Sequence, residues 1–147
     1  MPMKKTTTKA RTRTKKDFDV MTVEQVMQKQ VQAVHLKTKG DVVASLMVEG
    51  FGAVPVVDSK DKLLGIVSEH DLLAALDDGH KLGAVSASEI MTCNPYSIHP
   101  EAMIPTLIHV LRASDLIRVP VVDAKDKLVG IIARRDVLCA YLAAGRV

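Results

Sequence analysis

Aromatic residues and cysteines are scarce in this sequence of 147 residues, which contains no tryptophan, 3% aromatic residues and two cysteines. Cys93 and Cys139 stand far apart and form no CxxC pair, which excludes a disulfide scaffold and favours two small buried side chains. No histidines have the HxH or HExxH spacing of a metal site, so we expect no bound metal. The shortage of aromatic side chains also argues against a surface that stacks nucleic-acid bases.

Long apolar runs and the loops of common catalytic sites are missing as well. No apolar run approaches the roughly 20 residues that cross a bilayer, and the basic N-terminus is not followed by the apolar region of a signal peptide. We therefore expect a cytoplasmic protein with no membrane partner. The sequence has no Walker loop, G-x-G-x-x-G loop or G-x-S-x-G elbow. We expect no enzymatic activity, no catalytic residues and no catalytic cofactor.

Positive charge is concentrated at the start of the chain. Residues 1–16 contain seven lysines and arginines and no acidic residue, whereas the net charge of the whole chain is only +3. The rest of the chain is therefore mildly acidic. Residues 1–19 have few apolar side chains to bury, so we expect a basic, disordered tail. Nucleic acid would be a partner only through residues 1–16, by salt-dependent contacts with phosphates that ignore sequence.

The dominant feature of the sequence is an internal repeat. The segment VPVVDSKDKLLGIVSEHDLLAAL, residues 54–76, recurs as VPVVDAKDKLVGIIARRDVLCAY, residues 119–141, with 14 of 23 positions identical. Each copy has an apolar run, a polar turn, a second apolar run and a leucine-rich segment with helical spacing. This pattern predicts a strand, a hairpin turn, a strand and a helix in each repeat.

Three matched pairs of elements are predicted before these copies: short helices that begin with capping boxes, short first strands, and amphipathic helices. They lie at residues 22–25 and 86–89, 31–36 and 96–99, and 41–49 and 104–113, respectively. Asp41 is the expected N-cap of its helix.

This order predicts a mixed α/β (α+β) fold with two pseudo-twofold-related repeats, each a small three-stranded mixed sheet packed with helices. The predicted parts are the tail at 1–19, repeat 1 at 20–80 and repeat 2 at 81–147. Because so small a sheet is only marginally stable alone, we expect the two repeats to form one module.

The doubled VPVVD strand, the polar turn, the L-x-G-I strand with its following aspartate, and the leucine-rich helix resemble the cystathionine β-synthase (CBS) domain pair, or Bateman module. The resemblance covers residues from about 22 to 144. It implies a regulatory module, commonly dimeric, that binds adenosine-containing ligands such as AMP, ADP, ATP or S-adenosylmethionine in clefts between the repeats.

The resemblance therefore predicts a stand-alone ligand sensor that forms a homodimer and signals its occupancy to an unknown regulated protein. The alternative is a structural dimerisation protein or a nucleic-acid-associated protein that acts through its basic tail.

Asp71 and Asp136 match the aspartate with which the family binds ribose, and Ser68 matches a hydroxyl that contacts phosphate at the start of a helix. The alternative is helix capping, with Ser68 as N-cap and an acid at the third helical position. In the second repeat Ala133 replaces the serine while Asp136 is retained. This difference favours a ligand role for the two aspartates.

Arginines distinguish the second repeat from the first. Arg118, Arg134 and Arg135 are candidates for phosphate binding, at positions where the first repeat has Ala53, Glu69 and His70. The alternative for Arg134 and Arg135 is that they point to water. The charge difference predicts that the cleft of the second repeat prefers a phosphorylated ligand. From the resemblance, the nucleobase cleft is expected to contain Val34, His35, Ile98, His99, Ala53, Val54, Pro55, Val119 and Pro120.

Overall fold

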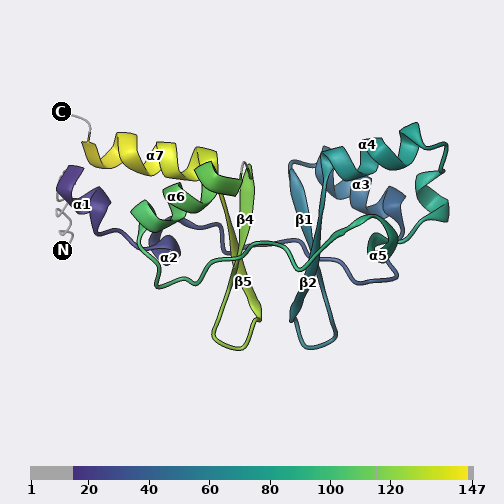
Figure 1. Ribbon diagram of the computed structural model, residues 1–147, viewed down its shortest axis with the longest axis horizontal. Coiled ribbons are helices and arrows are strands. Elements are labelled where there is room, and N and C mark those ends of the chain that lie inside the picture. The colour runs from purple at the N-terminus through teal and green to yellow at the C-terminus, as the bar shows by residue number, and fades with distance from the viewer. Residues whose placement is uncertain (1–14, 115, 146–147) are drawn as a thin grey trace, which may run out of the picture.

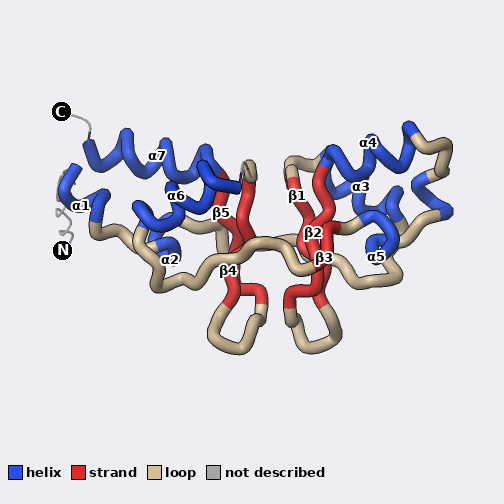
Figure 2. The backbone as a smooth tube through the Cα atoms, in the orientation of Figure 1, coloured by secondary structure: helices blue, strands red, loops and turns tan. Residues whose placement is uncertain are grey.

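The computed structural model describes residues 15–114 and 116–145, which form two similar lobes lying side by side (Figure 1). The elements, in chain order, are α1 (Lys15–Asp19), α2 (Val23–Val26), α3 (Gly40–Val48), β1 (Ala53–Val57), β2 (Leu63–Ser68), α4 (Glu69–Asp77), the 3-10 helix η1 (Leu82–Ala84), α5 (Ala87–Ile90), β3 (Thr92–Cys93), α6 (Ile104–Ser114), β4 (Arg118–Val122), β5 (Leu128–Ala133) and α7 (Arg134–Gly145). The strands face each other at the centre and the helices lie on the outer flanks (Figure 2). The predicted mixed α/β fold is confirmed.

Each lobe is built on an antiparallel hairpin made from the repeated VPVV segment. In the first lobe β1 pairs with β2, with Val54 opposite Val67, and β3 adds a third strand beside β2. In the second lobe β4 pairs with β5, with Val119 opposite Ile132. Four consecutive residues of β1 and of β4 are buried, whereas buried and half-buried residues alternate along β2 and β5. The first strand of each hairpin is therefore covered on both faces.

The predicted first strands at 31–36 and 96–99 are much shorter in the structure than expected. Each contributes a single parallel bridge, Val34 to Val56 and Ile98 to Val121. The first segment ends early because the chain turns at His35, whose carbonyl accepts a hydrogen bond from the N–H of Thr38 (3.1 Å). The second ends at Pro100, which has no N–H to continue a ladder.

The short helices α2 and α5 are exchanged between the lobes. Val23 of α2, from repeat 1, is buried in the core that contains α6 and α7, and Ala87 of α5, from repeat 2, is buried in the core that contains α3 and α4 (Figure 1). Both predicted capping bonds are present: the N–H of Thr22 donates to Gln25 Oε1 (2.9 Å) and the N–H of Ser86 donates to Glu89 Oε1 (2.8 Å). The boundaries 20–80 and 81–147 therefore divide the sequence repeats but not the lobes.

The hairpin turns of the two lobes contact each other across the pseudo-twofold axis. The N–H of Leu63 donates to the carbonyl of Asp126 and the N–H of Leu128 donates to the carbonyl of Asp61, both at 3.0 Å. The two aspartates have matching positive φ angles of 65° and 64°, a conformation that aspartate tolerates better than most residues. These reciprocal bonds hold the hairpins beside each other.

The amphipathic helices α3 and α6 lie within one residue of their predicted bounds. The expectation that Asp41 caps α3 is wrong: the N-cap is Lys39, and the Asp41 carboxylate accepts a hydrogen bond from the N–H of Val42 (2.9 Å). Within the described parts of the chain, none of the helices is both long and apolar enough to span a membrane.

Two expectations about solvent exposure are wrong. Residues 15–19 form α1 rather than part of the tail, and Phe18 is buried in the second lobe, where its ring meets that of Tyr141 edge-on at 5.3 Å. Cys93 and Cys139 are exposed, because one lies on the short edge strand β3 and the other on the outer side of α7. Residues 1–14 of the predicted tail lie outside the described residues.

Candidate functional site

Two clefts lie where the starts of β1 and β4 meet, and each is lined by residues of both repeats. The first cleft has a volume of about 560 Å³ and is lined by Gly52, Ala53, Ile66, Ser68, Glu69, His70, Asp71, Leu73, Thr92, Asn94, Pro95, Tyr96, Leu116, Ile117, Arg118 and Pro120. The second cleft, of about 240 Å³, is lined by Gln28, Gln30, Val31, Gln32, Gly50, Phe51, Gly52, Ala53, Arg118, Ile131, Ala133, Arg135 and Asp136. The clefts are pseudo-symmetric in position but unequal in size.

Asp71 lies at the N-terminus of α4, on the wall of the first cleft, and forms a capping box with Ser68. Its Oδ2 accepts hydrogen bonds from the Ser68 N–H (2.8 Å) and Oγ (3.0 Å), and Ser68 Oγ accepts one from the Asp71 N–H (3.2 Å). Oδ1 of Asp71 accepts no hydrogen bond from any described residue. Asp71 can therefore cap the helix with one oxygen and offer the other to a ligand.

Asp136 has the same position at the N-terminus of α7, in the second cleft. Its Oδ2 accepts a hydrogen bond from the N–H of Ala133 (2.8 Å), so half of the capping box persists without the serine. Its Oδ1 accepts a hydrogen bond from Gln28 Nε2 (3.2 Å). Both oxygens of this carboxylate are therefore engaged by the protein itself.

Arg118, the first residue of β4, is half-buried and lines both clefts. Its guanidinium lies directly against Gly52, where an added Cβ would overlap it. The absence of a side chain at Gly52 leaves room for the guanidinium in this position. The expectation that Arg118 belongs to the second site alone is wrong, because its side chain lines both clefts.

The other two candidate arginines are separated by the first turn of α7. Arg135 lines the second cleft, and its side chain is exposed. Arg134 lies outside both clefts, beside α6, and its Nε donates a hydrogen bond to the carbonyl of Leu116 (2.6 Å). Of the arginines predicted for repeat 2, only Arg135 is confined to the second cleft.

The residues expected to form a nucleobase cleft divide into two groups. Ala53 lines both clefts and Pro120 lines the first. The others lie elsewhere: Val34, Val54, Pro55, Ile98 and Val119 are buried in the lobes. His35 and His99 face backbone instead, with Nδ1 of each within hydrogen-bonding distance of the Val57 (3.2 Å) and Val122 (3.0 Å) carbonyls, respectively.

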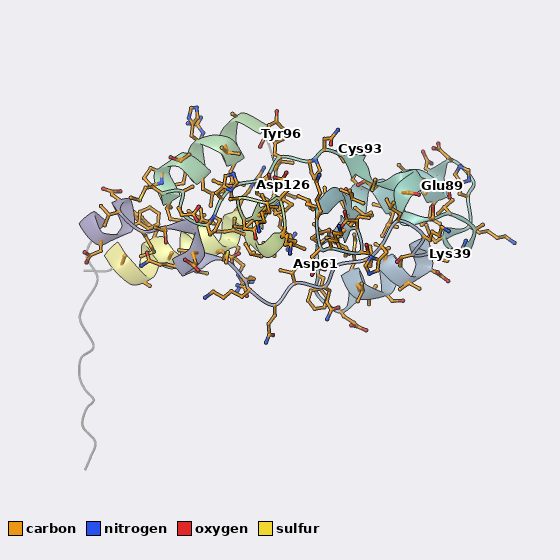
Figure 3. All side chains as sticks on the ribbon, turned by 90° about the horizontal axis from the view of Figure 1, so that it is seen from below. Lys39, Asp61, Glu89, Cys93, Tyr96 and Asp126 are labelled. Atoms are coloured by element: carbon orange, nitrogen blue, oxygen red, sulfur yellow. The ribbon has the colours of Figure 1, made fainter. Side chains whose placement is uncertain are left out.

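Sequence reasoning missed the residues that follow the exchanged helices. Thr92, Asn94, Pro95 and Tyr96 line the first cleft, and Figure 3 places Tyr96 on the segment that crosses between the lobes. Gln28, Gln30, Val31 and Gln32 occupy the matching positions in the second cleft. Both groups follow their capping boxes, 22–25 and 86–89, by the same number of residues in the sequence. This matched spacing was the signal that could have identified them.

Comparison with known sequences identifies the repeat. The profile of the CBS domain matches residues 23–78 and again residues 87–143. The chain belongs to the CBS domain family. The resemblance seen in the doubled VPVVD pattern is thereby confirmed, and the chain contains two CBS repeats.

Curated CBS relatives differ in how much of their length the chain spans. A CBS domain-containing protein of Dictyostelium discoideum is 31% identical over 127 residues, which are 79% of this chain and 88% of that protein. Inosine-5'-monophosphate dehydrogenase of Methanocaldococcus jannaschii is 30% identical over 101 residues, 69% of this chain but 19% of the enzyme. The similarity to that enzyme is therefore confined to about a fifth of it.

Solved CBS structures share the fold. CBSX2, solved in complex with AMP, is 31% identical with a TM-score of 0.75, and the match covers 82% of this chain and 96% of that one. A protein with CBS domains from Burkholderia ambifaria is 25% identical with a TM-score of 0.78, covering 86% and 98%. Both matches span nearly the whole of those chains.

Proposed function

We propose that this CBS pair is a regulatory module that binds an adenine nucleotide, with AMP as its preferred ligand, and signals occupancy to a regulated protein. The observation that carries the proposal is the first cleft, where a carboxylate, a guanidinium and an apolar wall line one space. Its volume of about 560 Å³ lies within the usual range for small-molecule sites, roughly 300 to 1,000 Å³.

The ribose is assigned to Asp71. A carboxylate oxygen that caps no helix accepts hydrogen bonds from the adjacent 2'- and 3'-hydroxyls of a ribose, and a charged acceptor makes such bonds stronger than neutral ones. Asp71 keeps Oδ2 on Ser68 and turns Oδ1 to the ligand. Asp136 has the same role in the second cleft once Gln28 leaves it.

The phosphate is assigned to Arg118 and the N–H groups at the N-terminus of α4, which together supply donors and positive potential. Ser68 lies beside this position, with its hydroxyl hydrogen donated to Asp71. Glu69 also lines the first cleft and repels additional negative charge. A monophosphate therefore suits this cleft better than a triphosphate. Arg135 is the corresponding phosphate candidate in the second cleft.

The base is assigned to the apolar wall formed by Ala53, Ile66 and Pro120, with Tyr96 at the rim. An adenine ring buried there removes apolar surface from water, and an aromatic side chain adds stacking. CBSX2, 31% identical and solved with AMP, supports this choice of nucleotide.

The first cleft, not the second, is the principal site in this proposal. The sequence favoured the second cleft because of three arginines, but Arg134 lies elsewhere and Arg118 is shared. The remaining Arg135 is exposed, where an ion pair contributes only about 0 to 1 kcal/mol. A volume of about 240 Å³ is below the usual range for a small-molecule site, and this size difference outweighs one solvated charge.

Regulation follows from the composition of the cleft. Its walls come from both lobes, so a bound nucleotide contacts both and favours the arrangement of lobes that binds it best. The regulated protein is expected to distinguish that arrangement from the ligand-free one.

Isothermal titration calorimetry of nucleotide-stripped protein with AMP, ADP, ATP and S-adenosylmethionine tests the proposal. We expect saturable binding of AMP, weakened about tenfold or more by Asp71→Ala, the size of one hydrogen bond to a charged group. Asp71→Asn keeps one side-chain oxygen that can accept the capping hydrogen bonds from Ser68. It is therefore the control that separates loss of the ligand contact from loss of the helix cap. Asp77→Ala, at the exposed far end of α4, should bind AMP as the wild type does. No heat and no melting shift at millimolar AMP would exclude the proposal.

A further inference from the structure

We propose that Gln28 is a gate that lowers the nucleotide affinity of the second cleft by competing with the ligand for Asp136. The inference rests on the nucleotide-binding function proposed above and adds the reason why two sites built from one repeat differ.

The side chain of Gln28 is in direct contact with Asp136. Gln28 Nε2 donates a hydrogen bond of 3.2 Å to Oδ1 of Asp136, the oxygen that is not used to cap α7. It corresponds to the oxygen of Asp71 that does not cap α4 and that is assigned to the ribose in the proposal above. A ribose that enters the second cleft competes with the Gln28 amide for this oxygen.

The first cleft serves as an internal control for the effect of Gln28. The residue in the position of Gln28 is Thr92, since Gln28 bridges to Ile131 and Thr92 pairs with Ile66 at the matching place in each hairpin. Among the described residues, Thr92 makes no side-chain hydrogen bond to Asp71. Threonine is shorter than glutamine, and the cleft that contains it is the larger one, about 560 against 240 Å³.

The backbone hydrogen bonds of Gln28 do not depend on its side chain. The N–H of Gln28 donates to the Ile131 carbonyl (2.8 Å), and the N–H of Ile131 donates to the Gln28 carbonyl (3.0 Å). These bonds involve no side-chain atom of Gln28. Replacing the side chain with threonine therefore leaves the strand bridge in place and removes only the contact with Asp136.

The strength of the contact makes it a gate rather than a permanent block. The bond is solvent-exposed and 3.2 Å long, near the upper limit for a good N–H···O bond. A net contribution of one such bond corresponds to a change in affinity of roughly tenfold or less. The first cleft is then filled at low AMP, and the second is filled only when AMP is abundant.

The experiment uses calorimetric titration with AMP in an Asp71→Ala background, in which the second cleft is the reporting site. Gln28→Thr in this background should raise the AMP affinity of the second cleft several-fold, up to about tenfold. Lys29→Thr, an exposed neighbour that lines neither cleft, is the matched control and should leave the affinity unchanged. The reciprocal variant Thr92→Gln, made in the otherwise wild-type protein, should weaken binding at the first cleft.

Two results overturn the gate. If Gln28→Thr proteins that melt like their parent gain no AMP affinity, or if Thr92→Gln leaves the AMP affinity of the first cleft unchanged, Gln28 does not lower the affinity of the second cleft. Failure of the nucleotide-binding function itself gives a different pattern, in which the wild type does not bind AMP at all.

Discussion

Asp58 and Asp123 stabilise the two copies of the repeated turn by accepting backbone hydrogen bonds. Oδ1 of Asp58 accepts hydrogen bonds from the N–H groups of Lys62 (2.9 Å) and Lys60 (2.8 Å). In the turn of the second repeat, Oδ1 of Asp123 accepts the matching bonds from the N–H groups of Lys125 (2.8 Å) and Lys127 (3.0 Å). These backbone bonds, with a smaller attraction from the same lysines, hold the pKa of both carboxyls below its ordinary value. The ionised form is the one that closes each turn.

The low pKa of these two groups predicts a specific acid sensitivity. A carboxyl whose pKa is lower in the folded state stabilises the protein above its unfolded pKa, about 3.9, and loses that contribution as pH falls through its folded pKa. The double variant Asp58→Asn, Asp123→Asn should have a lower melting temperature than the wild type at pH 7. Its melting temperature should fall by less than that of the wild type on acidification to pH 3. Melting temperatures measured across this range check it, with Asp77→Asn as control. Equal acid sensitivity in wild type and double variant would contradict the assignment.

At the scale of elements, the exchanged helices α2 and α5 are held by glycines that allow close approach. A Cβ on Gly130 would lie 2.6 Å from Met27 Sδ and 2.9 Å from the Gln28 carbonyl, and one on Gly65 would lie 2.5 Å from Met91 Sδ and 2.8 Å from the Thr92 carbonyl. Both distances to backbone oxygen are too short for real contacts. The segments that carry the cleft residues Gln28 and Thr92 therefore pack against the hairpins only because both positions are glycine.

Gly130→Ala should accordingly lower the free energy of unfolding by about 1 to 3 kcal/mol, the usual range for overpacking a closely packed site. Gly65→Ala should do the same in the other lobe. Denaturant unfolding measures the change. Gly83→Ala, where an added Cβ would meet only the Asp41 side chain, at 3.3 Å, is the control. A Gly130→Ala protein as stable as the wild type would show that the exchanged segment does not require this contact.

The hairpins and the longer helices could be predicted from the sequence because their signals are local. Short runs of apolar, β-branched residues on either side of a polar turn define β1–β2 and β4–β5, and helical spacing defines α3, α4, α6 and α7. The lobe on which α2 and α5 pack depends on tertiary contacts, since Val23 and Ala87 are apolar and fit either core. Thr92 and Tyr96 were missed for this reason, and the shared position of Arg118 depends on the same arrangement of the lobes.

At the scale of the whole molecule, α4 and α7 expose leucines on the outside. Leu73, Leu76, Leu138 and Leu142 are between 50% and 63% exposed, and the two helices lie along the same side of the molecule (Figure 1). Exposed apolar side chains on two helices of the same side are typical of a surface that a protein partner covers.

We therefore predict a homodimer with twofold symmetry that covers these helices. Leu138→Glu combined with Leu142→Glu should shift the protein to the monomer, since two charges would then be buried at the interface. Analytical ultracentrifugation measures the mass, and Lys81→Glu, at an exposed site on another segment, is the control. A wild-type protein that sediments only as a 16.0 kDa species at micromolar concentration would contradict the dimer.

The proposed function requires that Asp71 and Arg118 hold an adenine nucleotide in the first cleft. A crystal structure of the wild-type protein grown with AMP tests it most directly. We expect AMP between the lobes, with its ribose hydroxyls on Oδ1 of Asp71, its phosphate near Arg118 and Ser68, and its base against Ala53, Ile66 and Pro120. AMP bound elsewhere, or a first cleft without nucleotide at saturating AMP, would contradict it.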